Sequence, residues 1–158
     1  MTDRTEELIG ELTAAREDLL SALDGLAPAL LEQRALIGDW GARELIAHLG
    51  YWAGHAVEAI HAVETGRADE FGADRPSVED INATVARVAR QTDLATVRRR
   101  EAASVEAFVE RLGAMDPALL DVALPHHGLT LVEGIREDGA AHYREHAAQL
   151  RDAGGVPP

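Results

Sequence analysis

Two histidines near the carboxyl end of the chain, His142 and His146, have the spacing of a metal-binding pair. Residues four apart on an α-helix project from the same face, about 6 Å apart along the axis. Two imidazoles placed in this way can bind one divalent cation. The pair needs support from other residues, because a chain with seven histidines can produce such a spacing by chance.

Cysteine and lysine are both absent from the sequence, and all 15 basic side chains are arginines. The composition therefore excludes disulfides, thiolate nucleophiles, iron–sulfur clusters and Schiff-base chemistry. A metal in this protein must be held by histidine and carboxylate side chains.

His48 is the best candidate for a third ligand, because it lies on a different predicted helix. It sits beside the apolar positions Leu45, Leu49 and Trp52, so its imidazole faces the interior or its edge. A lone histidine at such a place usually bonds a backbone carbonyl. The histidine pair on another helix makes metal ligation a credible alternative.

Hydrophobic periodicity predicts four long helical regions. Alanine, leucine and valine dominate the apolar content, and aromatic residues make up only 4%, which favours packed helices over a sheet sandwich. Thr92-Asp93 looks like an internal cap that could divide the third region, and a short turn is expected over 29–33. We therefore expect a single all-α domain over residues 1–158, a four-helix bundle with long connections. The predicted helical regions are 3–23, 42–65, 78–112 and 130–152.

Trp40, His48-Leu49 and His142-x-x-x-His146, taken together, resemble the DinB/YfiT-like superfamily, which includes mycothiol-dependent maleylpyruvate isomerases. The resemblance covers nearly the whole chain. It implies an up-down-down-up helix order, a homodimer and one divalent metal ion held by three histidines. These ligands map to His48, His142 and His146. We expect no second domain like that of the full isomerases, so the resemblance does not imply their specific reaction.

Three histidine ligands leave coordination positions open on a divalent ion, as in catalytic sites. Such an ion acidifies a bound water or thiol. We expect a metal-dependent thiol transferase or hydrolase acting on a small molecule, and the resemblance implies a low-molecular-weight thiol like mycothiol or bacillithiol. Zinc or nickel suits imidazole ligands, although the sequence does not identify the metal. The alternative is a non-catalytic bundle that serves dimerisation or small-molecule binding, with a structural or vestigial metal site.

The segment His142-x-x-Glu145-His146 also matches a zinc-peptidase signature in which the glutamate is the general base. That reading needs a further ligand downstream, where Asp152 is the only side-chain carboxylate. We therefore expect Glu145 to support the site from outside the ligand set or to lie on the surface. A di-iron site would need two Glu-x-x-His motifs, and Glu58-x-x-His61 is the only one.

The remaining histidines carry no assigned role. His55 lies seven residues after His48 and could approach the site, but solvent or the edge of the core is the expected place. His61 is expected to be exposed, and His126-His127 to belong to a polar loop before the last helix.

The net charge of −13 predicts that the protein binds neither nucleic acid nor an anionic membrane surface. The first ten residues are charged rather than apolar, and no run is long enough to span a membrane. The expected location is the cytoplasm.

Overall fold

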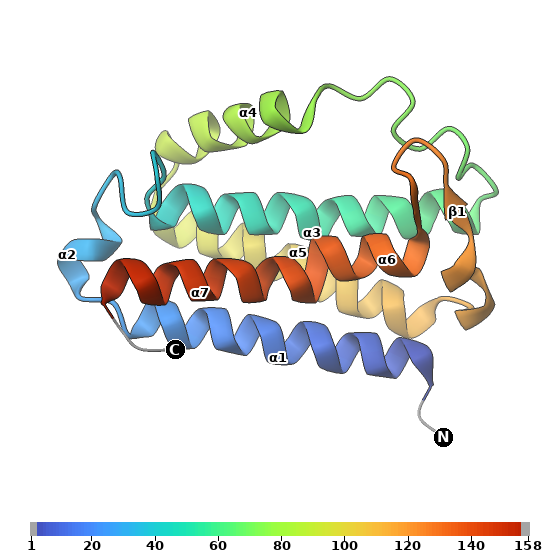
Figure 1. Cartoon of the computed structure of the whole chain (residues 1–158), viewed down its shortest axis with the longest axis horizontal. Coiled ribbons are helices and arrows are strands. Elements are labelled where there is room, and N and C mark those ends of the chain that lie inside the picture. Colours follow the sequence, from blue (N-terminus) through green and yellow to red (C-terminus); the bar gives the residue numbers. More distant parts are fainter. Residues whose placement is uncertain (1–2, 156–158) are drawn as a thin grey trace.

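The computed structural model describes residues 3–155, and its architecture is a four-helix bundle. In Figure 1, α3 and α5 run in one direction, whereas α1 and the continuous run from α6 to α7 point the opposite way. This is the up-down-down-up order that the family resemblance implied. The bundle helices are α1 (Arg4–Asp24), α3 (Ala42–Glu64), α5 (Leu94–Ala114), α6 (Leu131–Arg136) and α7 (His142–Gly154).

Long connections allow α3 and α5 to run in the same direction. The short helix α2 (Pro28–Leu31) joins α1 to α3, and α4 (Val78–Arg90) returns the chain along the outer side of α3. The predicted break at Thr92-Asp93 is confirmed, because the Asp93 carboxylate accepts the Thr96 backbone N–H at 2.8 Å and begins α5.

Two features of the last third of the chain differ from the predicted loop and helix. A 3-10 turn, η1 (Pro117–Asp121), leads into a small antiparallel hairpin of β1 (Ala123–Leu124) and β2 (Leu129–Thr130). A π-helical turn, η2 (Glu137–Ala141), then interrupts the last predicted helix. Residues of both features, such as Leu124 and Asp138, line the same cavity as His142, so they shape the surroundings of the predicted site.

The core is built mainly from leucine and alanine side chains, with Phe108 and Tyr143 as its largest fully buried members. Small residues let the backbones approach closely. At Gly50 of α3, an added Cβ would lie 3.0 Å from the Cα of Glu101 on α5. A larger residue would therefore push these two helices apart.

A buried carboxylate, that of Glu101, joins three bundle helices. The side chain is 3% exposed and receives two bonds from Arg16 of α1, each 2.8 Å long. Its third donor is the hydroxyl of Tyr143 on α7, at 2.6 Å. Because Tyr143 stands between His142 and His146 in the sequence, this network fixes how α7 faces the rest of the bundle.

Replacing Tyr143 by phenylalanine tests this network. Loss of the hydroxyl leaves a buried carboxylate with one donor fewer, so the free energy of unfolding should fall by about 1–3 kcal/mol. Urea unfolding at neutral pH measures the change. Tyr51→Phe is the matched control, because Tyr51 is 40% exposed, and it should leave stability unchanged.

The same variant predicts a difference at alkaline pH. Burial and the neighbouring Glu101 raise the pKa of Tyr143 far above its usual value, so the fold keeps this phenol protonated while the unfolded chain ionises. The unfolded state then binds fewer protons, and stability should fall as the pH rises above about 10. Tyr143→Phe should lack this fall. An identical alkaline profile in both proteins would contradict the network.

Candidate metal centre

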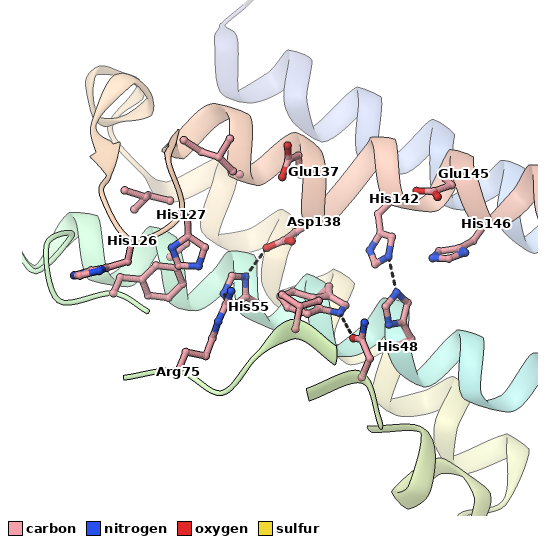
Figure 2. Close-up of a pocket in the computed structure, with 18 of the residues that line it drawn as sticks. His48, His55, Arg75, His126, His127, Glu137, Asp138, His142, Glu145 and His146 are labelled. Atoms are coloured by element: carbon pink, nitrogen blue, oxygen red, sulfur yellow. Dashed lines mark hydrogen bonds and ion pairs between the residues drawn. The ribbon is translucent and has the colours of Figure 1, made fainter. Parts of the chain in front are cut away.

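The three predicted ligands, His48, His142 and His146, lie together in the structure. His48 comes from α3, and the other two come from the first turns of α7. One ring nitrogen of each lies within 4.8 Å of the others, and the Nε2 atoms of His48 and His142 are 2.7 Å apart. Figure 2 shows the three imidazoles turned toward one another.

Burial keeps His48 and His142 in the neutral form that binds metals. His48 is 6% exposed and His146 is 9% exposed. Burial, with a further effect of His146, lowers the pKa of His48 to about 4. Burial and its two histidine neighbours lower the pKa of His142 to about 3. Both rings are therefore uncharged at neutral pH, with a lone pair available for a cation.

Neighbouring side chains hold two of the rings in place. The Nδ1–H of His146 donates to the Gln149 amide oxygen at 2.7 Å, which leaves Nε2 with its lone pair toward the cluster. His48 is flanked by two indoles, with ring centroids 4.8 Å away for Trp40 and 6.4 Å away for Trp52. The cluster is thus positioned before any ligand arrives.

The donor set fits a divalent transition metal. Histidine nitrogens lie about 2.0–2.1 Å from zinc, so two nitrogens on one ion are about 3 Å apart, close to the spacing of His48 and His142. The Nδ1 atoms of both rings are buried without a hydrogen-bond partner within the described chain. Three imidazoles with no carboxylate among them favour zinc, nickel, copper or iron over magnesium or calcium.

The π-helical turn η2 directs two functional side chains into one space. Gly139 leaves the helical region at φ −108° and ψ −110°, and an added Cβ there would lie 3.3 Å from Phe108 and 3.4 Å from Leu12. A π-turn inserts one extra residue into a helix and often occurs at functional sites. Asp138 and His142, on either side of this glycine, both line the cavity described next.

The three histidines line a cavity of about 630 Å³. Its walls also carry Trp40, Trp52 and Phe71. This volume is typical of a small-molecule site. A vestigial metal site would be expected to have this space filled by side chains, and here it is open.

His55 was expected at solvent or at the edge of the core, but the structure buries it in the cavity wall with 7% exposure. Its Nδ1–H donates to the Asp138 carboxylate at 2.6 Å, and its Nε2 accepts an N–H of Arg75. The sequence analysis missed Asp138 and Arg75. The position of Asp138, four residues before His142, is the one signal that could have indicated it.

The other unassigned residues are now placed. His126 and His127 belong to the hairpin loop and line the cavity. The ring of His127 is stacked on that of Phe71, with the centroids 4.8 Å apart and an angle of 19° between the planes. Burial, with nearby Arg75, lowers the pKa of His127. Glu145 is exposed and also lines the cavity, whereas His61 is exposed as expected and lies elsewhere.

The chain belongs to the DinB superfamily, whose sequence profile matches residues 11–150. Comparison with curated proteins gives no match. Two solved structures share the fold. An uncharacterised protein from Escherichia coli UTI89 has a TM-score of 0.77 and 14% identity, over 96% of this chain and 93% of its own. The colibactin self-resistance protein ClbS was solved in complex with double-stranded DNA. It has a TM-score of 0.74 and 15% identity, over 100% of this chain and 99% of its own.

The exclusion of nucleic acid from net charge was wrong. ClbS, a protein of the same fold, was captured with double-stranded DNA. The physical reason is that binding depends on the charge of the surface in contact, which a sum over the whole chain does not describe. No helix within residues 3–155 is both long enough and apolar enough to cross a membrane.

The lowered histidine pKa values predict how the metal-free protein responds to acid. Below pH 6.5 the unfolded chain protonates His48 and His142, while the fold resists this until about pH 4 and 3. The unfolded state then binds more protons, so stability should fall as the pH decreases from 6.5 to about 4 for His48 and about 3 for His142, by up to about 1.4 kcal/mol per pH unit for each histidine.

His142→Asn should remove about half of this dependence, because one of the two titrating rings is gone. Urea unfolding in the presence of a chelator, repeated at several pH values, measures the slope. A slope as steep in the variant as in the wild type would show that these rings are not the ones held neutral.

Proposed function

We propose that this protein binds one divalent transition metal through His48, His142 and His146 and uses it to activate a small thiol or a water. The activated nucleophile would attack a small molecule held in the cavity, which makes the protein a thiol transferase or a hydrolase. The observation that carries this proposal is that three imidazoles converge at the wall of an open cavity. Membership of the DinB superfamily, whose members often bind metals, supports the metal assignment.

A bound divalent ion would lower the pKa of a coordinated thiol or water, so that a nucleophile forms near neutral pH. The chain itself offers groups that can take the released proton. Glu145 is one turn of α7 away from His142, lines the same cavity and is exposed to solvent, so its carboxylate can pass the proton on.

His55 is less suited to accept this proton. Its Nδ1–H is held by Asp138 and its Nε2 by Arg75, so both ring nitrogens are already engaged. Its role in the proposal is to hold these two side chains at the cavity wall. Trp40 and Trp52 pack beside His48, which is buried.

The alternative, a non-catalytic bundle with a vestigial metal site, accounts less well for the open cavity and for Glu145 beside the histidines. Double-stranded DNA belongs among the ligands to be tried, because ClbS was solved with it.

Metal binding is tested with protein purified without a histidine tag, stripped with a chelator and reloaded with zinc, nickel or cobalt. One ion per chain is expected. An ion that selects the folded state stabilises it by about 2.7 kcal/mol at a hundredfold excess over the dissociation constant. His48→Ala should abolish this gain and His61→Ala, outside the cavity, should keep it. No stabilisation by any of these ions would overturn the proposal.

Catalysis is tested with two probe reactions on the metal-loaded protein. In one, cysteine attacks monochlorobimane, its sulfur displaces chloride, and the fluorescent thioether is measured. In the other, water cleaves p-nitrophenyl acetate. A rate that requires the metal and His48 in either reaction supports the enzyme. Glu145→Gln should lower that rate about a hundredfold, with metal content unchanged. If the metal-loaded protein catalyses neither reaction faster than the metal-stripped protein does, the non-catalytic alternative is favoured.

A further inference from the structure

Arg75 is the one arginine among the described residues that line the cavity. It lies in the loop between α3 and α4, where its backbone N–H donates to the Gly72 carbonyl at 3.4 Å. Many arginines of this acidic chain pair with a carboxylate, as Arg16 does with Glu101. Within residues 3–155, Arg75 forms no such ion pair, although three acidic residues share the cavity with it.

An indole and an imidazole hold the guanidinium in place. It lies over the ring of Trp52, 5.5 Å from the centroid, and donates one N–H to His55 Nε2. The acceptor nitrogen is fixed because the opposite nitrogen of that ring donates to Asp138. A guanidinium has five N–H groups, so this arrangement orients the side chain and leaves most of its donors for a ligand.

The acidic residues around the cavity limit what that ligand can be. Asp138 is already bonded to His55, and Glu137 and Glu145 stand exposed on the wall formed by η2 and α7 (Figure 2). These carboxylates repel a highly charged molecule. One fixed positive charge among them suits a ligand with a single anionic group.

Trp52 separates this arginine from the metal centre. Its ring centroid is 6.4 Å from that of His48 and 4.9 Å from that of His55, which touches Arg75. A small molecule lying along the indole could reach both ends of the cavity. Its anionic group would lie at one end and its reacting atom at the other.

We propose that Arg75 binds a carboxylate or phosphate group of the substrate and so places the reacting atom at the three histidines. The planar fork of an arginine matches either group through two parallel hydrogen bonds. That this ligand is a substrate rests on the function proposed above. The anion site itself requires only Arg75 and the groups that hold it, so it can be tested without metal.

Tryptophan fluorescence is a suitable measurement, because the chain has two tryptophans and Trp52 lies beneath the guanidinium. Metal-free protein is titrated with propionate, with inorganic phosphate and with propionamide as the neutral counterpart. A fluorescence change that saturates with propionate or with phosphate identifies the anionic group that Arg75 binds. Propionamide should give no saturable change. Arg75→Gln should weaken this binding at least about tenfold, and Arg67→Gln, an exposed arginine of the same loop outside the cavity, should not.

Two further variants make the outcome decisive. Arg75→Lys keeps the charge but loses the fork, so it should bind several-fold more weakly than the wild type, and it serves if Arg75→Gln does not fold. His146→Asn should remove metal binding and keep anion binding, which separates this inference from the proposed function. Saturation by neither anion, or an affinity that Arg75→Gln leaves unchanged, would overturn the anion site while leaving the metal proposal standing.

Discussion

The arrangement of the three-histidine cluster depends on one buried interaction, in which the Glu101 carboxylate is bonded to Arg16 and Tyr143. A charge at 3% exposure is tolerated only when it is paired and hydrogen-bonded, and Arg16 and Tyr143 supply both conditions. Tyr143 is adjacent to His142 and three residues before His146, so anchoring its hydroxyl in the core sets the rotation of α7. That rotation turns the two histidines toward α3.

Helix α3 meets this arrangement from the other side. Gly50 allows it to lie against the backbone of α5 at Glu101, and His48 is two residues before this close approach. The same packing that buries the carboxylate therefore brings the third imidazole to the other two. The π-turn at Gly139 adds a local adjustment, because Asp138 and His142 come to line one cavity.

Much of the fold could be predicted from sequence because it depends on local periodicity. The four bundle helices, their order from the family resemblance and the cap at Asp93 all appear in the structure. The three-histidine cluster was predictable too, since two members share a helix face and His48 lies among core positions.

The remaining parts depend on contacts between distant segments, which periodicity does not reveal. Arg75 reaches His55 from a loop with no regular pattern, and Asp138 is directed by a distortion of the helix rather than by its spacing. The hairpin that carries His126 and His127 is too short to give a strand pattern. The net charge did not justify the exclusion of nucleic acid, because it averages over surfaces that act separately.

The central claim is that three histidines of one chain bind one ion and leave positions open toward the cavity. X-ray absorption spectroscopy of the zinc-loaded protein tests this directly, because it reports the atoms bound to the ion. We predict three imidazole nitrogens at about 2.0–2.1 Å from the zinc ion and, in addition, oxygen ligands from solvent. A shell with four imidazoles, or one made mainly of carboxylate oxygens with no imidazole signal, would contradict the account.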